Sequence, residues 1–175
     1  MTPKAAGAID WVMSHEGGWS DNPADPGGAT NYGISLRWLK AAGWDVDQDG
    51  DIDAADIAAL TPDGARRIYH AEFWERLNLE RVTSGLVARK VLDLFVNMGD
   101  RQAVLIIQRA AKAVGAPLDE DGIWGPLTLG SLNSYPSSEL LAAIRSEAAG
   151  FYRLLAAIRP ALAVFLRGWL TRAYS

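Results

Sequence analysis

The sequence has no cysteine and only two histidines, His15 and His70, among its 175 residues. The absence of cysteine excludes disulfide scaffolds, iron–sulfur clusters, thiolate zinc sites and cysteine nucleophiles. Zinc peptidases and amidases usually place two or three imidazoles around one metal ion, so such a site would have to recruit both histidines from distant segments. The composition therefore argues against a zinc hydrolase.

The chain also lacks a long hydrophobic run and a strongly basic face. No uncharged apolar stretch approaches the roughly 18 residues that a membrane span needs, and the N-terminus does not have the pattern of a secretory signal peptide. The net charge is −4, with −8 on residues 1–80 and only +4 on residues 81–175. We therefore expect a protein made in the cytoplasm, with no integral membrane segment and no nucleic-acid partner.

Apolar residues recur at helical spacing over most of the chain, and glycine and proline mark the breaks. The first predicted helix runs from Pro3 to His15 or Glu16. Residues 17–34 contain five glycines and two prolines, which predicts tight turns and a short hairpin near Tyr32 and Gly33. Further helices are expected to begin near Leu36, Thr61, Ser84, Asp100, Pro126 and Ser138. The predicted fold class is mainly α, with one turn or hairpin region after the first helix.

Glu16 is the first candidate for a catalytic group. A carboxylic acid at the end of a helix faces the negative end of the helix dipole, and the neighbouring Trp11 and Trp19 add apolar surroundings. Both effects favour the protonated form, which a general acid in glycoside hydrolysis requires. From spacing alone, a solvated residue at a helix end explains Glu16 equally well.

Asp25 and Thr30 follow in the turn region and could complete such a site. A second, solvated carboxylate at Asp25 would stay ionised, and two carboxyl groups in opposed environments form the acid and base of a glycosidase. The Thr30 hydroxyl could hold a water molecule beside Asp25. The alternative is that Asp25, which precedes a proline, serves only the backbone hydrogen bonding of a turn.

Residues 45–56 (DVDQDGDIDAAD) have the pattern of an EF-hand calcium loop. Oxygen ligands at loop positions 1, 3, 5, 9 and 12, a glycine at position 6 and an apolar residue at position 8 suit a hard cation with many oxygen ligands. The departure from the pattern is Asp56, where glutamate is commoner; dockerin-type loops, which the segment resembles, have the same aspartate. An acid-rich solvated turn is the alternative. The expected ligands of one structural Ca²⁺ are Asp45, Asp47, Asp49, Asp51 through its carbonyl, Asp53 and Asp56.

Several motifs resemble the N-acetylmuramidases of glycoside hydrolase family 108, which occur in bacteriophage endolysins and related bacterial proteins. The longest is residues 16–34 (EGGWSDNPADPGGATNYGI). Residues 73–74 (FW), 93–99 (DLFVNMG) and 165–172 (FLRGWLTR) also fit this family. Residues 122–128 (GIWGPLT) resemble the peptidoglycan-binding-like C-terminal part of these proteins. The resemblance covers nearly the whole chain.

The resemblance implies a lysozyme-like helical fold and a bacteriolytic endolysin that hydrolyses the bond between N-acetylmuramic acid and N-acetylglucosamine. Glu16 corresponds to the family's catalytic glutamate, whereas Asp25 and Thr30 match a Glu, Asp, Thr set of phage-type lysozymes with a spacing one residue shorter. Trp19 and Tyr32 are the expected substrate-binding residues. The resemblance also implies two parts of the chain. Residues 1–99 would form a catalytic part, and residues 100–175 a peptidoglycan-binding-like part that packs tightly on the first.

Two other functions stay open at this point. A cell-wall or protein-binding module could use Trp19, Trp124 and the dockerin-like acidic loop without using any carboxylate for catalysis, and a lytic transglycosylase would use one acid and no hydrolytic water. The aromatic residues Tyr69, Phe73 and Trp74 could line a sugar cleft, but their helical spacing favours the core. We expect a monomer that needs no cofactor for catalysis, reaches the cell wall or periplasm through a separate holin or secretion route, and acts there on peptidoglycan.

Overall fold

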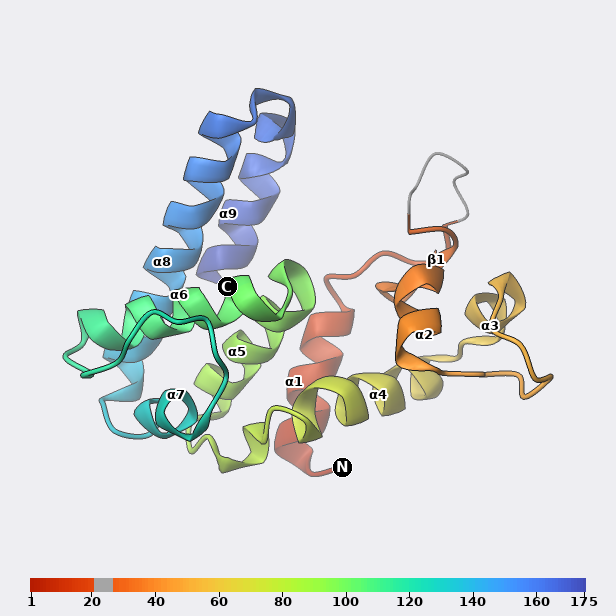
Figure 1. The fold of residues 1–175 in the computed structure, drawn as a ribbon, viewed down its shortest axis with the longest axis horizontal. Coiled ribbons are helices and arrows are strands. Elements are labelled where there is room, and N and C mark those ends of the chain that lie inside the picture. Colours follow the sequence, from red (N-terminus) through yellow and green to blue (C-terminus); the bar gives the residue numbers. More distant parts are fainter. Residues whose placement is uncertain (21–26) are drawn as a thin grey trace. The chain divides into compact units, whose positions relative to one another are not determined.

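A computed structural model describes residues 1–20 and 27–175 of the chain (Figure 1). These residues contain nine α-helices and one two-stranded antiparallel sheet, so the predicted mainly α fold is confirmed. They form two compact units, Met1–Arg76 and Leu77–Ser175.

The first unit combines short helices with the hairpin. The core is made where α1 packs against α4 and η1, and α3 packs against α2 and β1. Its buried side chains include Ile9, Leu39, Ile57, Ile68 and Trp74. The elements in chain order are α1 (Pro3–Met13), β1 (Thr30–Asn31), β2 (Ile34–Ser35), α2 (Leu36–Ala42), α3 (Ala54–Ala59), α4 (Pro62–Tyr69) and the π-helix η1 (His70–Glu75).

The second unit is a helical bundle in which α6 and α9 both pack on the long helix α8, and α5 packs on α6 and α8. Val91, Phe95, Ile107, Leu140 and Ile144 are among its buried side chains. The elements are the 3₁₀-helix η2 (Leu79–Arg81), α5 (Gly85–Met98), α6 (Asp100–Ala113), α7 (Pro126–Ser131), α8 (Ser137–Ile158), the 3₁₀-helix η3 (Pro160–Phe165) and α9 (Leu166–Tyr174).

Hydroxyl caps explain why the helix starts were predictable. The side chains of Thr2, Ser35, Thr61 and Ser84 each accept a hydrogen bond from a backbone N–H in the first turn of α1, α2, α4 and α5. Gly43 ends α2 in the left-handed conformation, with φ of 76°.

The predicted end of the first helix was wrong. α1 ends at Met13, because Ser14 Oγ and His15 Nδ1 both donate hydrogen bonds to the carbonyl oxygen of Trp11, at 2.7 and 2.8 Å. These side-chain bonds compete with further helical turns. Glu16 therefore lies in the turn after the helix, where its N–H donates to Met13 O at 3.2 Å.

Two further differences concern helix type. The helix expected from Thr61 through Leu77 is α-helical only to Tyr69 and continues as the π-helix η1, a form with one extra residue per turn that favours no particular sequence. The short helix α3 was not predicted, because its residues were assigned to the end of the acidic loop. It begins at a capping box in which Asp53 and Asp56 each accept a backbone N–H.

A buried ion cluster joins α5 to α9 in the second unit. Asp93 Oδ2 lies 3.1 Å from Lys90 Nζ, and Asp93 Oδ1 lies 2.7 Å from Arg172 Nε. Lys90 Nζ also donates to the carbonyl oxygen of Arg172 at 2.5 Å. Burial lowers the pKa of Lys90, and the charge of Asp93 opposes that shift. Burial, together with Asp93, raises the pKa of Tyr152 to about 12.

We expect Asp93→Asn to destabilise the protein strongly. The change would leave the Lys90 ammonium buried without its counter-charge, which costs about 3–5 kcal/mol. Urea unfolding at neutral pH measures this loss. The matched control is Arg109→Ala, which breaks an exposed pair with Glu120 and should move the unfolding midpoint little. Equal midpoints for the two variants would contradict the prediction.

Candidate functional site

The site is built on the hairpin between β1 and β2. Thr30 pairs with Ser35 and Asn31 with Ile34, so Tyr32 and Gly33 form a two-residue loop. Both have positive φ, 50° at Tyr32 and 77° at Gly33, as a type I′ turn requires. The buried Asn31 fastens the hairpin by donating from Nδ2 to Ile57 O at 3.3 Å.

Glu16 lies against this turn. A Cβ atom added at Gly33 would stand 2.7 Å from Glu16 Cγ, 2.8 Å from Glu16 Oε2 and 2.7 Å from Tyr69 Oη. The carboxyl group of Glu16 and the phenol of Tyr69 therefore converge on the space that Gly33 leaves open. Only glycine fits here, for its positive φ and for the close approach.

Tyr69 stabilises the turn through a hydrogen bond from its hydroxyl group. Its side chain is only 2% exposed, and its hydroxyl donates to the carbonyl oxygen of Tyr32 at 2.9 Å. The phenol comes from the last turn of α4, so a helix far along the chain fixes both the turn and one side of the Glu16 carboxyl group. Glu16 itself is half-buried.

The other expected site residues lie in different settings. Thr30 is half-buried, and its Oγ1 donates to Gly28 O at 3.3 Å, while its backbone N–H and carbonyl pair with Ser20. Trp19 is 51% exposed, which leaves its ring accessible. Tyr32 is half-buried and contributes its carbonyl to Tyr69. Asp25 lies outside the described residues.

The aromatic residues of the first unit divide into core and surface groups. Tyr69 and Trp74 are buried, as their spacing predicted. Phe73 is half-buried, and its ring stacks on Trp38 with centroids 5.9 Å apart and lies 5.7 Å from the Arg76 guanidinium.

The sequence analysis did not identify the roles of Gly33 and Tyr69 beside Glu16. The Tyr-Gly pair of the hairpin loop was the available signal for Gly33.

The acidic loop is closed by hydrogen bonds from its own backbone. Asp45 accepts from the N–H groups of Gln48 and Gly50, at 2.6 and 3.1 Å. The buried Asp56 accepts from Val46 at 2.5 Å through Oδ1 and from Asp53 at 2.7 Å through Oδ2. Asp56 thus joins the start of the loop to the start of α3.

The carboxylates of the loop form two groups of three. Oxygen atoms within each group lie within 4.8 Å of one another, and the groups are Asp45, Asp47 and Asp49, and Asp51, Asp53 and Asp56. Repulsion from Asp49 and Asp53 raises the pKa of Asp51, and desolvation with the charge of Asp49 raises that of Asp47. Burial would raise the pKa of Asp56, but four hydrogen bonds from backbone N–H groups outweigh burial and lower it.

This donor set fits a hard divalent cation. All six side chains offer carboxylate oxygen, and each oxygen that accepts one backbone N–H keeps a further lone pair for a ligand. Gly50 has φ of 99°, which supplies the sharp turn expected at the sixth loop position. Repulsion from neighbouring carboxylates contributes to the raised pKa values of Asp47 and Asp51, and a bound cation would remove that repulsion.

The 122–128 motif of the second unit is held by hydrogen bonds. The buried Gln108 donates to Asp121 Oδ1 at 2.7 Å and accepts from the N–H of Gly122 at 2.9 Å. Trp124 donates to Leu77 O at 3.1 Å, and its ring meets Phe95 edge-on with centroids 5.2 Å apart. The Trp124 side chain is therefore used in packing.

Comparison with known proteins gives two family matches. The model of the family described as glycosyl hydrolase 108 matches residues 9–99, and that of the family described as predicted peptidoglycan domain matches residues 102–174. Among solved structures, that of Brucella abortus SagA is similar, with a TM-score of 0.74 and 28% identity, over 97% of this chain and 88% of that chain. No curated protein gives a significant match.

We expect Gly33→Ala to lower the thermal midpoint more than Gly43→Ala. Both glycines have nearly the same positive φ, 77° and 76°, so both variants carry the same backbone strain, about 1–2 kcal/mol. Only at position 33 would the new methyl group meet Glu16 and Tyr69, since nothing lies within 4 Å of a Cβ at position 43. Thermal unfolding of the two variants would disprove the close approach if their midpoints were equal.

Proposed function

Because the chain belongs to the glycosyl hydrolase 108 family, we propose that it hydrolyses the β-1,4 bond between N-acetylmuramic acid and N-acetylglucosamine, with Glu16 as general acid. Family membership makes it a glycoside hydrolase, and the match to the peptidoglycan domain supports bacterial cell wall as its substrate. The likeness to SagA extends over both parts of the chain.

The position of Glu16 is the observation that carries this proposal. A general acid must hold its proton at a fixed place beside the bond that breaks. The Glu16 carboxyl group is confined by the Gly33 backbone and the Tyr69 phenol, and Tyr69 is itself fixed by its bond to Tyr32. A carboxyl group held against a fixed turn and a buried phenol loses little freedom when substrate binds.

In the proposed reaction, Glu16 donates its proton to the glycosidic oxygen as the bond between that oxygen and the anomeric carbon breaks. Water adds to the anomeric carbon, and its proton passes to Asp25, with Thr30 helping to orient the water. The roles of Asp25 and Thr30 rest on the sequence motif. Trp19, with its exposed ring, is suited to stack on a sugar.

Glu16→Gln should lower the rate of peptidoglycan hydrolysis by about 10²–10⁴, because the amide has no proton to donate to the leaving oxygen. The side chain keeps its size, so the melting midpoint should stay close to that of the wild type. Turbidity loss on purified peptidoglycan gives the rate. The variants Asp25→Asn and Thr30→Ala should lower the hydrolysis rate less than Glu16→Gln does.

The matched control is Glu139→Gln, which makes the same change at an exposed position of α8. Mass spectrometry of the released fragments separates the remaining alternatives: reducing ends indicate hydrolysis, and anhydro sugars indicate a lytic transglycosylase. Full activity in Glu16→Gln would refute the role of Glu16. No release of fragments by the wild type would leave a binding module as the function.

We also propose that residues 45–56 hold one structural Ca²⁺. The support is the twelve-residue pattern, the positive φ of Gly50 and the two carboxylate groups described above. Asp45, Asp47, Asp49, Asp53 and Asp56 would supply carboxylate oxygens, and Asp51 its main-chain carbonyl. The cation would neutralise the loop and fix the start of α3; it would take no part in the hydrolysis.

Calcium should raise the melting midpoint of the wild-type protein by several degrees over that in chelator, because an ion that binds only the folded form stabilises it by mass action. Magnesium should raise it less, since it resists irregular coordination by many oxygens. The double variant Asp45→Ala, Asp49→Ala should melt at one temperature in calcium and in chelator. A wild-type midpoint that chelator leaves unchanged would rule out the calcium site.

A further inference from the structure

The turn between α8 and α9 exposes several large apolar side chains. We call residues 153–167 the hairpin tip; they comprise the last turns of α8, all of η3 and the first residues of α9 (Figure 1). Leu154, Ile158, Val164 and Phe165 are each more than half exposed, from 54% at Phe165 to 77% at Val164. Leu154 and Ile158 are four residues apart and so lie on one face of α8.

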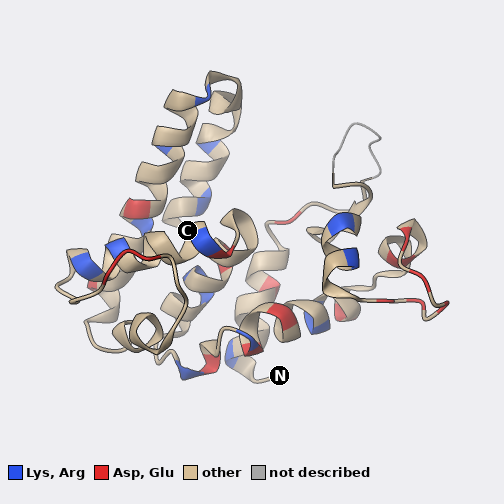
Figure 2. Cartoon of the chain, in the orientation of Figure 1, with Lys and Arg blue, Asp and Glu red and all other residues tan. Residues whose placement is uncertain are grey.

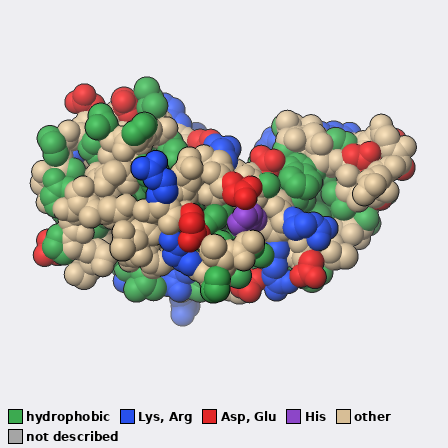
Figure 3. Space-filling model, turned by 90° about the horizontal axis from the view of Figure 1, so that it is seen from below, with side chains coloured by type: hydrophobic (Ala, Val, Ile, Leu, Met, Phe, Trp, Pro, Cys, Tyr) green, Lys and Arg blue, Asp and Glu red, His purple; other side chains and the backbone are tan. Residues whose placement is uncertain are grey.

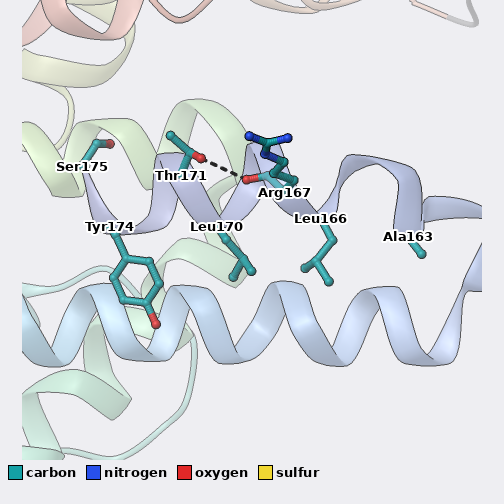
Figure 4. A pocket seen from close by; sticks show the side chains of 7 residues that line it. All are labelled: Ala163, Leu166, Arg167, Leu170, Thr171, Tyr174 and Ser175. Atoms are coloured by element: carbon teal, nitrogen blue, oxygen red, sulfur yellow. Dashed lines mark hydrogen bonds between the residues drawn. The ribbon is translucent and has the colours of Figure 1, made fainter.

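The apolar side chains of α9 form a separate group. Leu166, Leu170 and Tyr174 point toward α8 and line a groove along α9, whereas Arg167 and Thr171 point to the opposite side (Figure 4). In η3, Val164 is 77% exposed, and Phe165 is 54% exposed although its ring lies 5.8 Å from that of Trp169. Exposed apolar clusters of this kind mark surfaces that bind a partner or a membrane.

The charge of this surface has one sign. No aspartate or glutamate follows Glu147, and the last 28 residues contain four arginines. Arg172 pairs with Asp93 at the other end of α9. Arg159 and Arg167 are exposed and, within the part of the chain that the structure describes, form no ion pair. Figure 2 shows the far ends of α8 and α9 with basic segments alone.

Other surfaces of the protein differ in this respect. On the face seen in Figure 3, acidic and basic side chains lie near one another, and hydrophobic side chains occur between them. The chain as a whole is acidic, with a net charge of −4. The positive and apolar hairpin tip is therefore a local feature, and the overall charge does not explain it.

We propose that the hairpin tip docks on anionic lipid at a membrane surface. The four exposed apolar side chains would enter the interface, and Arg159 and Arg167 would bind lipid phosphates at its edge. No helix in the described residues is long and apolar enough to cross a bilayer, so the attachment is peripheral. This inference does not depend on the proposed hydrolase activity.

The same observations disfavour two other occupants. A second copy of the chain docked through the same surface would place arginines against arginines, with no acidic residue in the tip to pair with them. A wall polysaccharide would bind through polar groups and aromatic rings, and would leave Leu154, Ile158 and Val164 unused. Anionic lipid satisfies both the apolar side chains and the arginines.

Cosedimentation with vesicles of phosphatidylcholine and phosphatidylglycerol tests the proposal with the full-length protein. We expect binding to these vesicles, and much weaker binding to phosphatidylcholine alone or at high salt. Arg159→Gln with Arg167→Gln should weaken partition about thirtyfold, since each arginine near an anionic surface contributes about fivefold. Val164→Ser with Phe165→Ser should also weaken it.

The matched control is Leu127→Ser, at a side chain of α7 that is 79% exposed and lies outside the hairpin tip. It should bind vesicles as the wild type does. Equal binding to neutral and anionic vesicles, or binding that the paired variants do not change, would overturn the proposal. So would lipid-free dimerisation, seen by analytical ultracentrifugation, that Val164→Ser with Phe165→Ser abolishes, because the tip would then be an interface between copies.

Discussion

The close approach at Gly33 is the contact on which the first unit's site depends. One point of the hairpin turn meets the Glu16 carboxyl group from the turn after α1 and the Tyr69 phenol from the last turn of α4. Three segments separated along the chain are thus fixed relative to one another by the missing side chain of a single residue. The turn can take this shape because Tyr32 and Gly33 both adopt positive φ, and the Tyr69 hydroxyl satisfies the Tyr32 carbonyl that the turn exposes.

Local signals were enough to predict most of the fold. Hydroxyl caps and Gly43 act through bonds within one turn, so α1, α2, α4 and α5 begin where the sequence indicated, and α2 ends there too. The predictions were wrong where other interactions override the local helix pattern. Two side-chain bonds to Trp11 O end α1 early, and the π-helix η1, which contains the buried Trp74, has no local sequence pattern that specifies it.

The candidate site was predictable in its residues but not in its support. A long motif points to Glu16, yet the helix-dipole argument placed it in the last turn of a helix, whereas it lies in the turn beyond. Tyr69 was assigned to the core by its spacing, and it is buried; that its hydroxyl also reaches the turn depends on a contact across 37 residues. Spacing arguments report which face of a helix is buried, and they contain no information on what the tip of a buried polar side chain meets.

The two charged clusters of the chain illustrate opposite solutions to the same electrostatic problem. In the acidic loop, six carboxylates lie in two groups of three, and backbone N–H groups, with a small contribution from Lys40 at Asp51, compensate their charge only in part. In the second unit, Asp93 is buried between Lys90 and Arg172, so its charge is fully met by side chains. That pairing fastens the C-terminal end of α9 to α5, and Arg145 adds a bond to Ser175 O. The helical pair of α8 and α9 is therefore anchored by polar contacts at the end opposite the hairpin tip. Toward its tip the contact is weaker: Arg153 donates to the Tyr174 hydroxyl at 3.3 Å, while Arg159, Val164 and Phe165 are exposed, so that basic and apolar side chains are available there to a partner.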